Sequence, residues 1–368
     1  MKCDILIVGA GFAGAVLAER IASCMGRRCV LIDRRAHIGG NAFDTYDSAG
    51  VLVHPYGPHY FRTDSDAVVR YLSRFTAWHP VSYRALSYTE GRYWQFPVNL
   101  NTFEQLIGRP STAEEMESAL ADWRVPIAEP KNCEELLLSR LGPRLYELFF
   151  KNYTRKQWRR EPSELEAAVG ARIPVRTNRD DRYLSEKFQA LPKEGYAAMF
   201  RRMLDHPLIE VCLNTDFRDA RSSAPWAHVI YTGPIDEFYD HRFGALPYRT
   251  LRFEHETLQQ EFALPAMQIN YPGEEPFTRA VEIKHATGQV IPATSVVREF
   301  PEEYRVGKEP YYPVPAADAR ALHARYAELA AREANVTFVG RLATYRYINM
   351  DQVVTMALAE FERLKARI

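Results

Sequence analysis

The stretch that decides the fold is residues 3–41, CDILIVGAGFAGAVLAERIASCMGRRCVLIDRRAHIGGN. It opens with a short apolar run, residues 4–8, which has the length and β-branched content of a buried parallel strand. The pattern G-x-G-x-x-G follows and leads into a run of helix formers. A second apolar run, residues 29–32, ends on Asp33, 22 residues after Gly11. We therefore predict the strand–turn–helix–strand unit of a Rossmann-like α/β fold.

Three glycines and one acid in this stretch are the residue types that a dinucleotide site needs. Gly9 permits the tight turn, Gly11 lets the backbone approach a pyrophosphate, and Gly14 lets helix and strand pack closely. The helix N-terminus presents free N–H groups and the positive end of its dipole to phosphates. Asp33 can accept hydrogen bonds from a ribose diol. The alternative is a glycine-rich turn in an ordinary α/β unit.

A second glycine turn distinguishes between the two common dinucleotides. Arg34 and Arg35 follow the acid, and Gly39-Gly40-Asn41 comes shortly afterwards. A simple nicotinamide enzyme has no obvious need for another glycine turn here. FAD lies extended, so a second loop must pass close to its phosphates and ribityl chain. The residues favour FAD.

Composition bounds the class of protein. The chain has 368 residues, 46% hydrophobic and 26% charged, which suggests two or three globular domains. Lys and Arg total 47 and so do Asp and Glu, so the formal net charge is zero. The chain as a whole therefore does not attract nucleic acid or an anionic membrane electrostatically. No apolar run reaches 18 residues, and the N-terminal strand leaves no room for a signal peptide. Five scattered cysteines predict reduced thiols in the cytoplasm, with neither a metal site nor a disulfide framework.

The middle of the chain interrupts the α/β pattern. Residues 102–191 have helical periodicity, after which strands and helices alternate again to residue 234, and residues 248–300 alternate polar and apolar as in a half-solvated sheet. Helical spacing predicts helices at 64–75 (capped by Thr63 or Asp64), at 325–334 and from Met350. Two runs of strand-forming residues predict a hairpin at 83–97, and Thr112 and Glu115 have the spacing of a capping box. Arginines interleaved with Tyr and Trp at 152–158 and 171–183 suit a ligand with a base and phosphates; the alternative is a solvated basic loop.

Several long motifs make the chain resemble bacterial UDP-galactopyranose mutases over essentially its whole length. They are VGAGFAG with IGGN, YGPHYFRT, NYTRKQW, ARIPVRTNRDDRY, YTGPID, RFGALPYR, EPYYPV and FVGRLATYRYINMDQ. The resemblance implies a discontinuous Rossmann-like FAD-binding domain (1–78, 193–245 and 313–368). It also implies an inserted helical bundle with a mobile substrate lid (98–192) and a six-stranded antiparallel sheet domain (79–97 and 246–312).

The resemblance also implies an activity. The family is an isomerase that interconverts UDP-galactopyranose and UDP-galactofuranose with reduced FAD, which is not consumed. N5 of the flavin attacks the anomeric carbon and UDP leaves; the sugar ring opens and re-closes, and UDP re-adds. A cytoplasmic homodimer that serves cell-wall, capsule or O-antigen polysaccharide synthesis is the expected setting.

The candidate site residues come from the dinucleotide pattern, from the resemblance and, for Arg62, from a departure from the family pattern. They fall into three groups. Catalytic roles go to His59, Arg172 and Arg279. Substrate contacts go to Tyr153, Trp158, Arg172, Tyr183, Asn270, Arg279, Tyr312, Tyr347 and Arg62. Cofactor contacts go to Gly9, Gly11, Phe12, Gly14, Asp33, Arg34, Gly40, Asn41, His59, Gly340, Arg341, Tyr347, Asn349, Met350 and Gln352.

Two positions depart from the family pattern. Arg62 stands where the family usually has a second histidine, and Arg159 stands where the lid usually has glycine. A mutase for another nucleotide sugar, such as dTDP-fucose, a GDP-sugar or a UDP-N-acetylhexosamine, therefore stays open. An ordinary flavin amine oxidase or dehydrogenase also stays open, although it would not need Arg172, Arg279 and the tyrosines. The third alternative is a non-catalytic protein that binds FAD or a nucleotide sugar.

Overall fold

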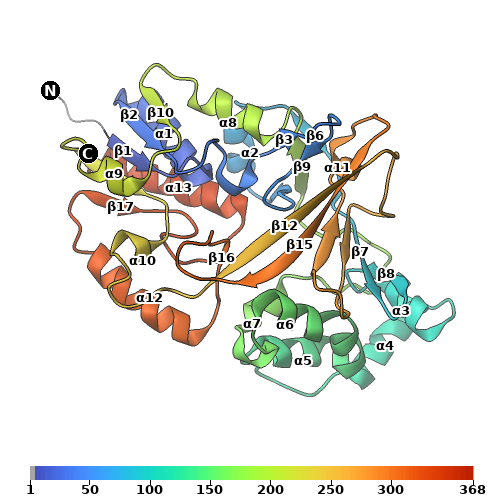
Figure 1. The fold of residues 1–368 in the computed structure, drawn as a ribbon. Helices are drawn as coiled ribbons and strands as arrows, with labels where there is room; N and C mark the ends of the chain where they lie inside the picture. Colours follow the sequence, from blue (N-terminus) through green and yellow to red (C-terminus); the bar gives the residue numbers. More distant parts are fainter. Residues whose placement is uncertain (1–4, 368) are drawn as a thin grey trace.

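Five parallel strands form the sheet that starts at the predicted glycine turn (Figure 1). The structure, a computed structural model, describes residues 5–367. The strand order is β10-β2-β1-β11-β17, with bounds β1 Ile5–Val8, β2 Cys29–Ile32, β10 Ile209–Cys212, β11 His228–Tyr231 and β17 Val336–Phe338. Ile5 pairs with both Cys29 and His228. The predicted strand–turn–helix–strand unit is thus confirmed, and its first strand lies at the centre of the sheet.

Helices from both ends of the chain cover this sheet. α1 (Phe12–Met25) packs against α13 (Met350–Lys365) and α8 (Tyr196–Leu204). The shorter helices of this part are α2 Asp66–Leu72, α9 Phe217–Arg221 and α10 Ile235–Phe238, and a longer one is α12 Ala317–Ala330. Two predicted helix starts were wrong. Ser65, not Thr63 or Asp64, caps α2 by accepting a hydrogen bond from the Val68 N–H (3.3 Å). The helix predicted at 325–334 is α12, and it begins earlier, at Ala317. Its first turns are rich in alanine, which favours a helix even where the charges show no periodicity.

A second, seven-stranded sheet runs beside the parallel one in the order β16-β12-β15-β14-β13-β7-β8. The bounds are β7 Ala85–Thr89, β8 Arg92–Phe96, β12 Tyr248–Leu258, β13 Gln268–Asn270, β14 Arg279–Val281, β15 Thr294–Glu303 and β16 Tyr312–Pro313. The long strands β12 and β15 cross the molecule diagonally in Figure 1.

The predicted six-stranded antiparallel sheet needs two corrections. The short strand β16 adds a seventh member through the pairs Tyr248–Pro313 and Arg249–Tyr312. The pair β13–β7 is parallel, with Asn270 opposite Ser87. No hairpin joins these two strands, so chain connectivity does not force them to be antiparallel.

Two smaller sheets complete the set of strands. One has the order β5-β9-β6, from Phe61–Thr63, Phe188–Pro192 and Trp78–Pro80, and the other pairs β3 (Thr45–Tyr46) with β4 (Leu52–Val53). The short helix α11 (Lys284–Thr287) lies beside β4, and a 3-10 turn spans Gly40–Ala42. β5 begins two residues after His59.

The predicted helical insertion lies between β8 and β9 and forms the teal and green helices in the lower part of Figure 1. Its helices are α3 Leu100–Ile107, α4 Ala113–Trp123, α5 Cys133–Tyr146, α6 Asn152–Trp158 and α7 Ala167–Ala171, with a π-turn at Glu147–Lys151 and a 3-10 turn at Pro162–Glu164. Thr112 caps α4 by accepting from the Glu115 N–H (3.3 Å), the first half of the predicted capping box. No helix within residues 5–367 is long and apolar enough to cross a bilayer. Cys3 lies outside the described residues.

Candidate functional site

A cavity of about 660 Å³ lies where the parallel sheet, the seven-stranded sheet and the helical insertion meet. Of the predicted site residues it is lined by Gly9, Gly11, Phe12, Asp33, Arg34, Gly40, Asn41, His59, Arg62, Tyr153, Trp158, Arg172, Tyr183, Arg279, Tyr312, Gly340, Arg341, Tyr347, Asn349 and Met350. Gly14, Asn270 and Gln352 are not among its lining residues. One continuous space therefore joins the dinucleotide turn to the arginines of the insertion and the second sheet. No group of His, Cys, Asp or Glu in the described part of the chain could hold a metal ion.

The two glycine turns form the floor of one end of the cavity. Gly9 has a φ of 101°, and a Cβ there would lie 2.1 Å from Thr232 Oγ1. A Cβ on Gly14 would lie 1.9 Å from the Gly9 carbonyl oxygen, so this glycine serves close packing and not ligand contact. A Cβ on Gly40 would approach Gly11 Cα at 3.0 Å. The backbones of both turns are thus in contact and open toward the cavity, which suits an extended dinucleotide.

Asp33 links the first glycine turn to the segment that follows β2. Its carboxylate accepts hydrogen bonds from the Ala10 N–H (2.8 Å) and the Arg35 N–H (2.9 Å). A carboxylate has about four acceptor positions, so Asp33 can still accept from a ribose diol. It holds the first turn and presents the remaining oxygen lone pairs to the cavity.

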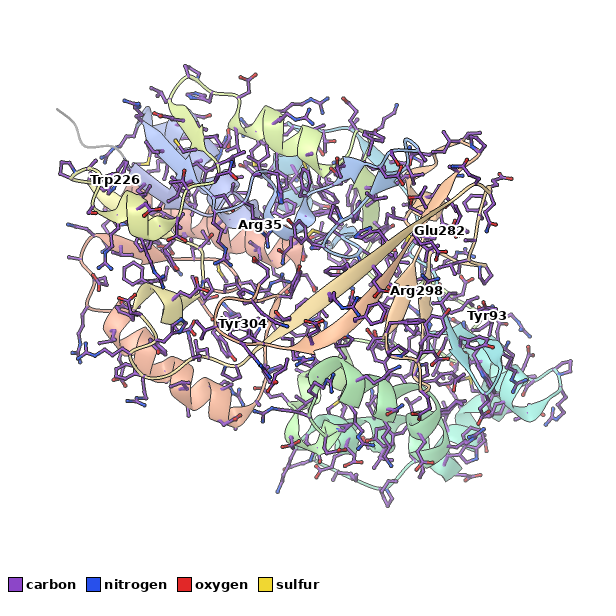
Figure 2. All side chains as sticks on the ribbon, viewed as in Figure 1. Arg35, Tyr93, Trp226, Glu282, Arg298 and Tyr304 are labelled. Carbon is purple, nitrogen blue, oxygen red and sulfur yellow. The ribbon has the colours of Figure 1, made fainter. Side chains whose placement is uncertain are left out.

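A cluster of charged residues lies at the same end of the cavity, and its acidic member, Glu309, was not predicted from the sequence. Glu309 accepts from Arg35 (2.6 Å) and pairs with Arg34 (3.2 Å). Arg35, labelled in Figure 2 between the two large sheets, also donates to Asn41 Oδ1 (2.7 Å) and stacks on Tyr56 at 4.4 Å. The loop before β16 is in this way tied to the loop after β2. Such long-range ion pairs leave no local pattern in a sequence.

His59 is held in one tautomer. Its Nδ1 lies 2.9 Å from the Gly57 carbonyl oxygen, so Nδ1 carries the proton and Nε2 is an acceptor. Its backbone N–H donates to His54 Nδ1 (3.1 Å). Burial, reinforced by the charge of Arg341, lowers the pKa of His59 to about 4. The ring is therefore neutral at pH 7 and offers an acceptor, not a positive charge. His54 was not predicted as a site residue.

Arg279, on β14, is oriented by a buried carboxylate. Its Nε and Nη2 donate to the two oxygens of Glu299 at 2.8 and 2.9 Å, and the Glu299 side chain is only 2% exposed. This bidentate pair fixes the plane of the guanidinium. The remaining N–H groups of Arg279 are available to a ligand in the cavity. Glu299 is a further residue that the sequence analysis missed. It follows Arg298 on a strand that ends in two more acids, so its sequence context does not distinguish it.

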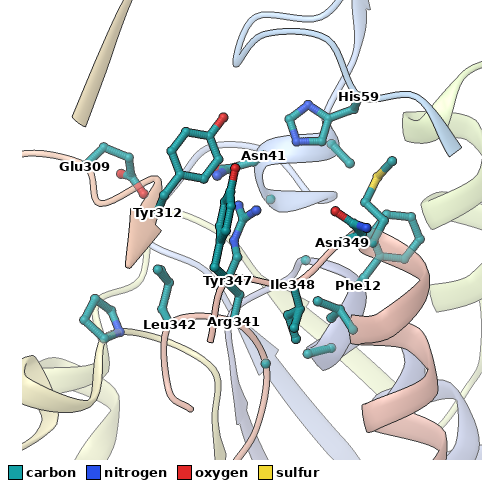
Figure 3. Close-up of a pocket in the computed structure, with 18 of the residues that line it drawn as sticks. Phe12, Asn41, His59, Glu309, Tyr312, Arg341, Leu342, Tyr347, Ile348 and Asn349 are labelled. Carbon is teal, nitrogen blue, oxygen red and sulfur yellow. The ribbon is translucent and has the colours of Figure 1, made fainter. Parts of the chain in front are cut away.

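An aromatic cluster lies opposite Arg279 and carries Arg172. The Arg172 guanidinium lies 4.1 Å from the Tyr347 ring centroid and donates to Asn349 Oδ1. The Tyr347 ring meets Trp158 edge-on at 5.3 Å and Tyr312 at 5.7 Å. In Figure 3 the hydroxyl groups of Tyr312 and Tyr347 point toward the side of the cavity where His59 lies. Cations and hydroxyl donors thus converge on one region.

Tyr183 is supported from behind by a chain of hydrogen bonds. Tyr83 donates to Gln268 Oε1, and Gln268 Nε2 donates to Asn270 Oδ1 (2.7 Å). The Asn270 side chain hydrogen-bonds to the Tyr183 hydroxyl, while burial raises the pKa of that hydroxyl. Asn270 therefore lies behind Tyr183 and acts on the cavity through it.

The two departures from the family pattern have structural consequences. Arg62, on β5, lines the cavity and pairs with Glu186 (3.3 Å). Arg159 ends α6 in the left-handed conformation, with φ 53° and ψ 31°. That conformation is strained for an arginine and would suit glycine.

Comparisons with known proteins agree with this geometry. A model of the UDP-galactopyranose mutase family matches residues 148–347, and a model of NAD(P)-binding Rossmann-like domains matches residues 7–75. A probable UDP-galactopyranose mutase of Klebsiella pneumoniae is 40% identical over 96% of this chain and 93% of that protein. A dTDP-fucopyranose mutase of Escherichia coli is 37% identical over 96% of each chain. The crystal structure of a reduced UDP-galactopyranose mutase shares the fold, with a TM-score of 0.77 at 18% identity over 99% of this chain and 96% of that one. The chain belongs to the UDP-galactopyranose mutase family.

Proposed function

We propose that the protein interconverts UDP-galactopyranose and UDP-galactofuranose, with FAD in its reduced form as cofactor. The observation that carries this proposal is the single cavity in which two glycine turns face Arg172, Arg279 and the tyrosine cluster. A flavin oxidoreductase needs the glycine turns but has no use for diphosphate-binding arginines. A nucleotide-sugar mutase needs both.

The residues at the dinucleotide end fit FAD. The backbone approach at Gly11 and Gly40 and the N-terminus of α1 suit a pyrophosphate. At the other end of the chain, Gly340 has a φ of 93° and a Cβ there would lie 3.1 Å from Ala13 Cβ, so the C-terminal loop also presents bare backbone beside α1. Reduced FAD, when bound, supplies the nucleophile that replaces UDP at the anomeric carbon of the sugar.

The protein's own side chains have three tasks in this reaction. Arg172 and Arg279 bind the diphosphate and stabilise the negative charge that develops as it leaves. Tyr153 on α6 contacts the base and Trp158, on the same helix, faces the sugar. With the arginines, Tyr153 keeps the departed UDP in place for its return. His59, neutral and with Nε2 as acceptor, can receive a hydrogen bond in the cavity without adding a charge.

A second substrate has specific support. The relative from Escherichia coli acts on dTDP-fucopyranose, and Arg62 replaces a histidine that the family usually has. Arg62 adds a positive charge to the cavity wall, and the carboxylate of Glu186 pairs with that charge. If the sugar differs from galactose, Arg62 is the residue we expect to contact it.

The assay compares nucleotide sugars with and without dithionite. We expect UDP-galactofuranose to be converted to UDP-galactopyranose only when the flavin is reduced, with no net oxidation. Arg279→Ala should retain FAD and lose turnover, whereas Arg298→Ala on the neighbouring strand, half-exposed and paired with Glu256, should keep it. If the protein converts dTDP-fucopyranose but not the UDP sugars, its substrate is dTDP-fucopyranose and not UDP-galactopyranose. Redox turnover of an amine would refute the proposal.

The setting is part of the same proposal and is supported by the family resemblance. We infer a homodimer in the cytoplasm that supplies galactofuranose for cell-surface polysaccharides. Sedimentation at several protein concentrations tests the dimer.

A further inference from the structure

Helix α6 and the loop of residues 272–277, here called the clamp loop, hold two halves of the proposed nucleotide site. α6 carries Tyr153 and Trp158, both of which line the cavity. The clamp loop joins β13 to β14, and Arg279 is the first residue of β14. The base-contacting and diphosphate-contacting side chains therefore come from segments that are far apart in the sequence.

Two side chains on one face of α6 fasten it to the clamp loop. Lys156 and Asn152 lie four residues apart and so project on the same side of the helix. The Lys156 ammonium donates to three loop carbonyl oxygens, those of Gly273 (3.0 Å), Glu275 (2.8 Å) and Phe277 (3.0 Å). Asn152 Nδ2 donates to the carbonyl oxygens of Pro272 (2.8 Å) and Gly273 (3.1 Å). Neither side chain is among the residues that line the cavity.

The clamp loop needs these donors. Its carbonyl oxygens converge on one point, and without a donor they would be partly buried and unsatisfied. A Cβ on Gly273 would lie 2.7 Å from Glu275 Oε2, so the loop is tightly folded. Burial lowers the pKa of Lys156 to about 8 against the opposing charges of Glu275 and Glu274, so the ammonium form still predominates at pH 7. Lys156 thus occupies the loop in the way that a bound cation would.

The opposite side of Arg279 is already fixed by Glu299, through two hydrogen bonds of 2.8 and 2.9 Å. The distance from the guanidinium to α6 is then set by the clamp loop. We propose that Lys156 and Asn152 are positioning residues that hold Tyr153 and Arg279 at the spacing of a nucleoside diphosphate. This inference rests on the proposed function, because it assumes that the ligand joins a base to a diphosphate.

Binding of fragments distinguishes positioning from general structural support. UDP gains affinity over uridine and pyrophosphate because its two parts are held at the spacing of the two subsites. Lys156→Met should therefore weaken UDP binding about 10-fold, equivalent to about 1.4 kcal/mol, and leave the affinities for uridine and for pyrophosphate within about 2-fold of wild type. Lys156→Arg, which retains a cation and donors, should recover most of the loss.

The experiment uses the full chain loaded with FAD and measures binding by titration calorimetry or competition. Lys151→Met is the matched control, since Lys151 is half-exposed just before α6 and only pairs with Glu147 at 3.8 Å. Asn152→Ala removes two of the five hydrogen bonds and provides a milder variant if Lys156→Met does not fold. UDP affinity within about 2-fold of wild type in both variants would overturn the proposal, as would a parallel loss of uridine affinity. Wild-type protein that binds FAD but no UDP would refute the proposed function, and this inference with it.

Discussion

Replacing Glu299 by glutamine tests the role of Arg279 most sharply. Glutamine has nearly the same shape but no charge and only one acceptor oxygen, so one of the two bonds to Arg279 is lost and the guanidinium stays buried without a counter-charge. Breaking a buried ion pair in this way costs about 3 kcal/mol. With an unfolding entropy of roughly 2.1 cal/mol/K per residue over 368 residues, that corresponds to a fall in Tm of roughly 4 °C.

Bound UDP should compensate for the missing charge. If the diphosphate binds Arg279, it supplies the negative charge that the glutamine side chain lacks, so the Tm rise on adding saturating UDP should be larger in Glu299→Gln than in wild type. Scanning calorimetry with and without UDP measures this difference. Glu256→Gln is the control: it breaks the exposed pair with Arg298, labelled in Figure 2, and should change the free energy of unfolding by less than about 1 kcal/mol. An equal or smaller UDP effect in Glu299→Gln would refute the diphosphate role of Arg279.

Three further predictions concern stability and cofactor retention. Burial lowers the pKa of His228 to about 4, so the folded chain keeps this ring neutral while the unfolded chain protonates it below about pH 6.5. Acidification from about pH 6.5 to about pH 4.5 should therefore cost about 2 kcal/mol of stability through this ring, and urea unfolding curves of His228→Gln should show a pH-dependent loss that is smaller than that of wild type by this amount. Arg159→Gly should raise Tm by roughly 1 °C by relieving about 1 kcal/mol of left-handed strain, whereas Arg155→Gly within α6 should lower it. Glu309→Gln should release FAD about 5-fold faster after dilution, since it loses ion pairs worth about 1 kcal/mol over the dinucleotide end; an unchanged rate would contradict a closing role for that loop.

The dinucleotide end was predictable because its chemistry is local. The strand, the three glycines, the helix and Asp33 follow one another within a single unit, and each residue type has a stated physical reason. Short apolar runs likewise predicted the parallel strands, and the alternation of apolar and polar residues predicted the second sheet. What it could not predict was the pairing between distant strands, and so the parallel pair β13–β7 and the edge strand β16 were missed.

The supporting residues of the site were not predictable for the same reason. Glu299, His54 and Lys156 act through partners that the fold brings close, at Arg279, at the His59 amide and at the clamp loop. None of them has a distinctive local spacing. Asn270 is the opposite case, a residue that was predicted but does not line the cavity. The family resemblance predicted that it contacts the substrate, but in the structure it hydrogen-bonds to Tyr183 and lies outside the cavity lining.

The central claim is that one cavity holds reduced flavin and a nucleotide sugar together. A crystal structure of the protein with reduced FAD and UDP tests it directly. We predict the FAD pyrophosphate beside Gly11, the UDP diphosphate at hydrogen-bond distance, about 3 Å, from Arg172 and Arg279, and the base against Tyr153. A diphosphate bound away from both arginines, or UDP that occupies the dinucleotide end in place of FAD, would contradict the account.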